Sequence, residues 1–297
     1  MRKLVAVLVF CFFYFVSNAC EVCGYGNAIN AIGLLPQFSK SFIGVRYAYQ
    51  TFTTTHPDDK EIEADRFMQF ELNGRYVISN RLQCSFSLPY AINQQKGTAH
   101  LQSNGVGDIT TFLTYTAIPT KNIGKSNLYH ALQFVIGVKL PTGKYKNDFS
   151  SSTFNEHLYP GTGSWDFIPT LNYVINYKQI GINLDISAKL NSNNKLFYKM
   201  GNQRSGNFKL FYNNNRLKVN LIPFLALGYL TSKADINAAK EVLYTGGYEW
   251  NAQFGADVMY NKYLVGFQYL KPVDQKWNDG YSCHEAKFNI RFLYFFK

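Results

Sequence analysis

Apolar and polar residues alternate along most of this chain, in segments of about ten residues separated by polar gaps. In the C-terminal segment 286–296, aromatic or aliphatic residues occupy every second position from Phe288 to Phe296, and Asn289 and Arg291 fall between them. Segments 180–190 and 248–260 repeat the pattern. Since successive side chains of a strand point to opposite faces, the pattern predicts strands with one apolar and one polar face.

The same test applied along the chain predicts about twelve strands. They are placed near 42–52, 66–77, 82–91, 108–118, 129–140, 166–176, 180–190, 201–212, 217–229, 248–260, 263–270 and 286–296. Pro89, Pro169 and Pro223 fall inside predicted strands, where a missing N–H requires local bulges.

The gaps between these strands differ in length in a regular way. Every second gap is tight, around Asn80, Lys178, Asn214 and Asn261 with a longer one at 119–128, and the gaps between them are long, at 53–65, 92–107, 141–165, 191–200, 230–247 and 271–285. A soluble β-sandwich also explains the alternation, but not this sorting, which is typical of outer-membrane barrels. We therefore predict an all-β fold: a transmembrane antiparallel up-and-down β-barrel of about 12 strands over residues 42–297, with both ends on the short-turn rim.

The N-terminus indicates export. Arg2 and Lys3 precede an apolar run from Leu4 to Val16, and small residues at 17 and 19 suit signal peptidase. We expect residues 1–19 to be a signal peptide, and a lipid-anchored Cys20 is the alternative. The segment 20–41 is then periplasmic or a plug inside the lumen.

Composition fits a location in a bilayer. Aromatic residues make up 17% of the chain, with 22 Tyr and 25 Phe, as aromatic girdles at the membrane interfaces require. The formal net charge is +11, but the basic residues are scattered through loops and an exported chain does not meet nucleic acid. We expect as partners the lipid of a Gram-negative outer membrane, its assembly machinery, which reads a C-terminal aromatic residue, and a small-molecule solute.

Charged residues fall on the polar face of the predicted strands. Because an unpaired charge is costly in a confined lumen, basic and acidic residues there are expected to pair. The signs nearly balance, so strong ion selectivity is not expected. The candidates for the lumen or its constriction are Arg46, Glu71, Arg75, Asp108, Lys139, Asp166, Asp185, Lys189, Glu249, Asp257 and Arg291.

Three short motifs follow one another between predicted strands: Gly-Val-Gly-Asp-Ile at 105–109, Val-Lys-Leu-Pro-Thr-Gly at 138–143 and Gly-Thr-Gly-Ser-Trp-Asp at 161–166. Together they resemble a family of outer-membrane channels named for the meta-cleavage pathway of phenol degradation. The N-terminal Cys-Glu-Val-Cys-Gly at 20–24 and the run Gly-Leu-Leu-Pro-Gln-Phe at 33–38 resemble a branch common in Bacteroidetes. The resemblance implies a passive barrel for small, often apolar or aromatic molecules.

Asp108, Lys139 and Asp166 lie within or beside these motifs, at the predicted outer rim. They form either a charged constriction or ion pairs that anchor loops. Cys20 and Cys23 are the candidate disulfide, with free thiols or a soft-metal site as alternatives, and neither a metal nor a cofactor is predicted. Cys84 falls on the lipid face, and His56, His100, His157 and His284 fall in predicted loops.

The function expected from these features is a porin-like outer-membrane channel for passive passage of small molecules. A non-conducting structural or adhesive barrel is the first alternative. An outer-membrane enzyme is less expected, because Ser164 or Ser282 with His157 or His284 would have to supply its nucleophile and base, and neither serine lies in a known nucleophile motif.

Overall fold

The structure is a computed structural model that describes residues 40–55, 61–97, 100–122, 128–145, 156–214 and 218–296. The predicted signal peptide, the segment 20–39 and the candidate disulfide of Cys20 and Cys23 lie outside the described residues.

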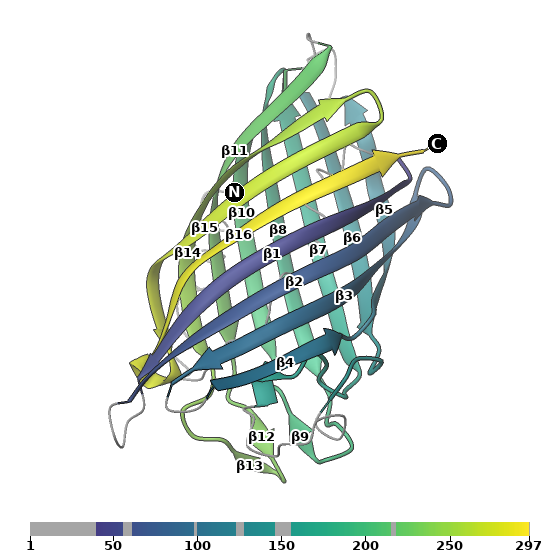
Figure 1. Ribbon diagram of the computed structural model, residues 1–297. Coiled ribbons are helices and arrows are strands. Elements are labelled where there is room, and N and C mark those ends of the chain that lie inside the picture. Colours follow the sequence, from purple (N-terminus) through teal and green to yellow (C-terminus); the bar gives the residue numbers. More distant parts are fainter. Residues whose placement is uncertain are drawn as a thin grey trace, which may run out of the picture.

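Long antiparallel strands form one closed ring (Figure 1). The elements are β1 Phe42–Thr55, β2 Ile62–Val77, β3 Leu82–Lys96, β4 His100–Val106, β5 Thr110–Asn122, β6 Leu128–Lys139, η2 Glu156–Leu158, β7 Asp166–Tyr177, β8 Ile180–Asn191, β9 Tyr198–Lys199, β10 Gln203–Tyr212, β11 Val219–Ser232, β12 Ile236–Asn237, β13 Lys240–Glu241, β14 Gly247–Tyr260, β15 Tyr263–Trp277, η3 Asn278–Gly280 and β16 Ser282–Phe295. The ring runs β1-β2-β3-β5-β6-β7-β8-β10-β11-β14-β15-β16 and closes where β16 pairs with β1, which gives the predicted 12 strands.

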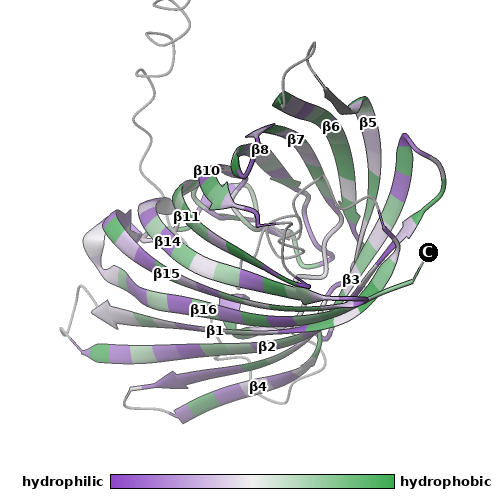
Figure 2. Ribbon diagram, turned by 90° about the horizontal axis from the view of Figure 1, so that it is seen from above, coloured by the Kyte–Doolittle hydropathy of each residue, from purple (hydrophilic) through white to green (hydrophobic). Residues whose placement is uncertain are grey.

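Alternate residues of each strand face lipid and lumen, as predicted. On β11, Leu225 and Leu227 are 64% and 56% exposed on the outside, while Ala226 between them is 5% exposed. Hydrophobic and hydrophilic positions alternate along the ribbons in Figure 2. The predicted outward position of Cys84 is confirmed, since its side chain is exposed. The barrel is thus apolar outside and mostly polar inside, the inverse of a soluble protein.

The first glycine motif separates two strands, β4 and β5, that both pair with β3. β4 pairs with the outer part of β3 and β5 with the inner part, so that both share one place in the ring. Between the paired parts, the three residues 107–109 lie opposite only two residues of β3, 88 and 89. The Gly107 N–H donates to Pro89 O at 2.8 Å. This one-residue surplus is a β-bulge. The predicted bulge is confirmed at Pro89 and wrong at Pro223, whose partner Ala256 lies in an unshifted register.

Two predicted loops are shorter than expected. β15 extends to Trp277 and β16 begins at Ser282, so the loop predicted over 271–285 is reduced to four residues, 278–281. Likewise, β3 and β4 form a hairpin across the loop predicted over 92–107. Apolar and polar residues do not alternate in these extensions because the strands protrude beyond the lipid there, and their outward-facing residues need not be apolar.

The long-loop end carries a small cap. There β9, β12 and β13 form a separate sheet, and η2 lies in the connection between β6 and β7 (Figure 1). In the described part of the chain, no helix is long and apolar enough to cross a bilayer.

Candidate functional site

The three motifs converge at the long-loop rim of the lumen. A Cβ on Gly143 would lie 2.5 Å from Gly107 C, and one on Gly161 would lie 2.8 Å from the backbone of Gly143, so only glycines allow this contact. Lys144 N–H donates to Val106 O at 2.9 Å, and Gly161 N–H donates to Lys144 O at 2.8 Å. Segments from each motif are therefore stacked backbone against backbone.

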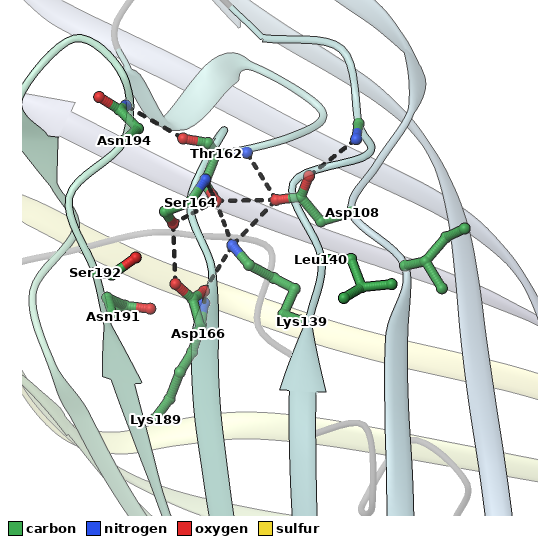
Figure 3. A network of polar contacts seen from close by, with 12 residues as sticks. Asp108, Lys139, Leu140, Thr162, Ser164, Asp166, Lys189, Asn191, Ser192 and Asn194 are labelled. Carbon is green, nitrogen blue, oxygen red and sulfur yellow. Dashed lines mark hydrogen bonds and ion pairs between the residues drawn. The ribbon is translucent and has the colours of Figure 1, made fainter.

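Lys139 lies at the centre of an ion-pair network at this rim (Figure 3). Its Nζ is 3.0 Å from Asp108 Oδ2 and 2.6 Å from Asp166 Oδ2, and it donates to Thr162 Oγ1. Lys189 Nζ reaches Asp166 at 3.4 Å. All four charged side chains are more than nine-tenths buried. Each charge is compensated, which burial at this depth requires.

The carboxylates also anchor the loop between β6 and β7. Asp108 accepts the Gly143 N–H, the Thr162 N–H and the Thr162 hydroxyl, each at 2.9 Å, while Ser164 Oγ donates to Asp166 at 2.9 Å. Of the two interpretations of this group, the contacts directly demonstrate loop anchoring. A constriction remains a proposal.

Two further ion pairs lie deeper in the barrel. Arg46 on β1 contacts Glu71 on β2 at 2.5 Å. Arg291 on β16 contacts both carboxylate oxygens of Asp257 on β14, at 2.6 and 2.8 Å. Between them on β15 lies Gly266, where a Cβ would be 2.3 Å from Asp257 Oδ1, so this glycine creates the space that the pair occupies.

Glu249 contacts a histidine, and both Glu249 and Asp185 accept hydrogen bonds from asparagine amides. Glu249 contacts His284 Nδ1 at 2.6 Å and accepts from Asn251 at 2.8 Å. Asp185 accepts from Asn207 Nδ2 at 3.3 Å. The prediction of a loop position for His284 is wrong, because it is a buried residue of β16.

Amide side chains connect these charged groups across the lumen wall from β8 to β16. Gln253 Nε2 donates to Asn207 at 2.9 Å and to Asn251 at 2.7 Å. Gln268 Nε2 donates to Gln253 Oε1 at 2.6 Å, and Asn289 Nδ2 donates to Gln268 Oε1 at 3.3 Å. This side of the lumen is filled by a continuous hydrogen-bonded layer.

Residues 156–164, which we call the cross-bar, contact β3 and β4 on one side of the long-loop end and the loop after β11 on the other. On one wall, Leu158 O accepts from Asn93 on β3 at 2.8 Å and from Ser103 on β4. On the other, His157 Nε2 lies 2.8 Å from the buried Asp235 Oδ2, just after β11. Five strands separate β3 from β11 along either path around the ring, so the cross-bar contacts segments that leave the ring on opposite sides.

Further bonds reinforce the cross-bar around His157. Asp235 also accepts the Gly201 N–H at 2.6 Å and the Tyr198 hydroxyl. Beside His157, Glu156 accepts from Tyr145, and burial together with this carboxylate raises the pKa of the Tyr145 phenol, so it stays a donor at physiological pH. The cross-bar is therefore a fixed part of the outer rim.

A cavity of about 150 Å³ lies inside the barrel under the cross-bar. Its walls come mainly from β1, β2 and β3, opposite the amide layer, and from the cross-bar itself. Small or apolar wall residues such as Ala48, Pro89 and Ala91 leave the space, and the ion pairs of Arg46 and Lys139 border it.

The short-turn end of the barrel has an apolar interior. Phe42, Leu264, Leu293 and Phe295 form one almost completely buried cluster there. Arg75 lies at this end, apart from the other charged candidates, with its guanidinium 5.2 Å from the Phe42 ring centroid. The polar inner face predicted for the strands therefore does not extend to this end of β1, β15 and β16.

The serine–histidine combinations do not assemble into a nucleophile and base among the contacts of the described residues. Ser282 Oγ bonds to Thr54 at 2.8 Å and to Asn278, while His284 bonds to Glu249. Ser164 bonds to Asp166 rather than to His157. Within the same residues, no group of three or more His, Cys, Asp or Glu side chains is placed to hold a metal ion.

Several lumen features were missed in the sequence, although a signal existed for some. The inward position of Lys287 follows from the alternation that identified Arg291, and the inward position of Leu293, which that alternation predicted, is confirmed. His157 lies in the single-turn η2 and Asp235 in a loop, where no periodicity relates one residue to the other.

No protein-family model matches this chain, and no curated protein matches it. Among solved structures, an outer membrane channel from Pseudomonas putida F1 is similar, with 17% identity, a TM-score of 0.67, and coverage of 86% of this chain and 96% of that chain. The β domain of the Bordetella autotransporter BrkA is similar at 9% identity and a TM-score of 0.52, covering 86% and 100%. These likenesses establish the fold. With its apolar exterior, the chain is an outer-membrane β-barrel.

Proposed function

We propose that this protein is an outer-membrane channel through which one small molecule at a time passes passively. The observation that carries the proposal is the cavity of about 150 Å³ inside a barrel whose outside is apolar and whose inner wall bears charges and amides. A barrel that served only as an anchor has no need of buried ion pairs around an open space, since paired buried charges add little stability compared with apolar packing.

The path is narrow at both ends. At the long-loop end, the cross-bar and the network around Lys139 form the constriction, to which Asp108, Asp166 and Lys189 contribute. At the short-turn end the apolar cluster of Phe42 and its neighbours forms a second barrier, and apolar constrictions in pores exclude water until they widen. We infer brief, low-conductance openings rather than a permanent aqueous pore.

Reconstitution into planar bilayers tests the proposal. The full-length mature protein is expected to give small discrete current steps, and liposomes containing it are expected to swell with small solutes but not with disaccharides. Absence of current and of swelling, including in a variant with the N-terminal segment 20–39 deleted, would refute a channel.

The two closed ends favour a specific alternative, a non-conducting structural or adhesive barrel. That alternative predicts the complete silence just described, together with cell-surface binding that depends on the outer loops. Turnover of lipid or peptide abolished by His284→Ala would instead support an enzyme.

A further inference from the structure

Polar side chains line β2 and β3 below the cavity under the cross-bar, which we call the chamber and of which the cross-bar forms the roof. Glu71 on β2 and Ser87 on β3 line the chamber itself. The next inward positions toward the short-turn end are Asn73 and Arg75 on β2 and Ser85 on β3, since residues two apart face the same side of a strand. These positions form a polar strip that leads away from the chamber.

At the level of Ser85, the bulky neighbours lean away from the strip. One row of paired residues crosses four strands there, with Phe42 on β1, Arg75 on β2, Ser85 on β3 and Phe112 on β5. The Arg75 guanidinium lies over the Phe42 ring, 5.2 Å from its centroid, on the β1 side. The Phe112 ring lies over Gly137 on β6, where a Cβ would be 2.6 Å from Phe112 Cε1. The smallest side chain of the row therefore lies between two large ones that point away from it.

Asn73 presents an acceptor at the upper end of the strip. Its side chain is 1% exposed, and its Nδ2 donates to Glu71 at 3.3 Å. Within the described residues, its Oδ1 has no hydrogen-bond partner. An unpaired buried amide oxygen is costly, so such a group is normally satisfied by water or by a ligand. The Asn73 oxygen is therefore placed to accept from water or solute that enters the strip from the chamber.

The interior toward β16 offers less room. Leu293 lies over Gly44 on β1, where a Cβ would be 2.3 Å from Leu293 Cδ2. Leu293 belongs to the apolar cluster with Phe42, and the amide layer occupies the wall from β8 to β16. A solute with hydrogen-bonding groups keeps polar partners along β2 and β3 and would lose them against the cluster, which is unfavourable.

We propose that solute leaves the chamber along the strip of β2 and β3, past Asn73 and Ser87, and that Ser85 sets the size of the solute that passes. The route runs beside the apolar cluster rather than through it, with Phe42 at the edge of the cluster. Arg75 borders the route, and its contact with the Phe42 ring keeps the guanidinium off Ser85. The proposal names the path within the proposed channel and rests on that function.

Cysteine substitution tests the route. In a protein whose native cysteines are replaced by alanine, Ser85→Cys in a planar bilayer is expected to lose its current when a charged, water-soluble methanethiosulfonate is added, and to regain it with dithiothreitol. Ser187→Cys is the matched control, because Ser187 is a buried, inward-facing serine of β8 that does not line the chamber. Its current is expected to persist. Equal losses in the two variants would contradict the assignment of the route to β2 and β3.

A bulkier side chain tests the role of Ser85 in size selection. Ser85→Leu is expected to lose liposome swelling with the largest of glycerol, erythritol, xylitol and sorbitol that the parent admits, and to retain swelling with glycerol. Migration of the unheated protein as a compact band in gel electrophoresis verifies that the barrel has folded. The same loss for all four polyols, or no loss for any, would remove Ser85 as the residue that sets the size limit.

Two results separate this proposal from the proposed function. Current in the Ser85→Cys protein that the reagent leaves unchanged would overturn the route and leave the channel standing. Absence of current and of swelling in the parent protein would refute the channel itself, and the route with it.

Discussion

Release of the cross-bar at one end is expected to open the barrel. His157→Ala removes the contact with Asp235 at 2.8 Å but leaves the bonds of Leu158 O to Asn93 and Ser103. A hydrogen bond to a charged group contributes about 1.5–3 kcal/mol. Asp235 keeps its bonds to Tyr198 and Gly201, so no charge is orphaned and the lower figure applies.

A loss of about 1.5 kcal/mol corresponds to a roughly ten-fold rise in the ratio of released to closed cross-bar. Liposome swelling should therefore be faster for His157→Ala, up to about ten-fold if release limits passage. His157→Gln, whose amide still donates to Asp235, should restore much of the parental rate. His130→Ala is the control for loss of a histidine, since His130 contacts Tyr173 on the barrel wall instead.

The contacts of the neighbouring Leu158 with β3 and β4 give an independent test. Ser103→Ala combined with Asn93→Ala frees Leu158 O and should raise the swelling rate in the same way. If loss of either contact is enough to open the path, the protein with all three substitutions should swell liposomes faster than the parent by less than the product of the two separate effects. Parental rates in correctly folded His157→Ala and Asn93→Ala/Ser103→Ala proteins would refute the assignment of the cross-bar as the outer barrier.

Three other substitutions test separate parts of the lumen. Gly266→Ala places a Cβ 2.3 Å and 2.6 Å from two atoms of the ion pair between β14 and β16, and should lower the free energy of unfolding, measured with urea in lipid vesicles, by about 1–3 kcal/mol. Gly206→Ala, whose Cβ has its nearest contact at 3.7 Å, should lower it less. Equal unfolding midpoints in the two variants would contradict this expectation. Asp166→Asn removes the carboxylate that contacts both Lys139 and Lys189 and should cost about 3–5 kcal/mol by the same measurement, partly restored by adding Lys189→Met. An unchanged midpoint would show that the network is dispensable. Leu264→Ala thins the short-turn cluster and should increase conductance while lowering stability by about 2–5 kcal/mol, and unchanged conductance would remove that cluster as a barrier.

The barrel could be predicted from the sequence because lipid imposes a strict rule on each strand. A residue such as Leu225 must be apolar and its neighbour Ala226 faces inward, and this period of two fixes both the strand and its orientation. The rule ends where lipid ends. Lys271, Asp274 and Gln275 continue β15 beyond the bilayer without alternation, and they were assigned to a loop for that reason.

The site was predictable only in part. Alternation identified inward charges such as Arg46 and Asp257, and local motifs placed Asp108 near Lys139. Which strands become neighbours also followed, because an up-and-down barrel pairs consecutive strands. Contacts across the lumen, such as that of His157 with Asp235, depend on the curvature of the ring and on loop conformation, and neither is encoded in strand periodicity.

The cross-bar also has a consequence for biogenesis. Its bonds join residues that are far apart in sequence and come together only when β3 and β11 are held at a fixed separation by a finished ring. A barrel whose β1–β16 seam is still unzipped therefore has no roof, and its interior is accessible from outside. Protection of His157 from a water-soluble labelling reagent would then report the last step of insertion, the closing of that seam.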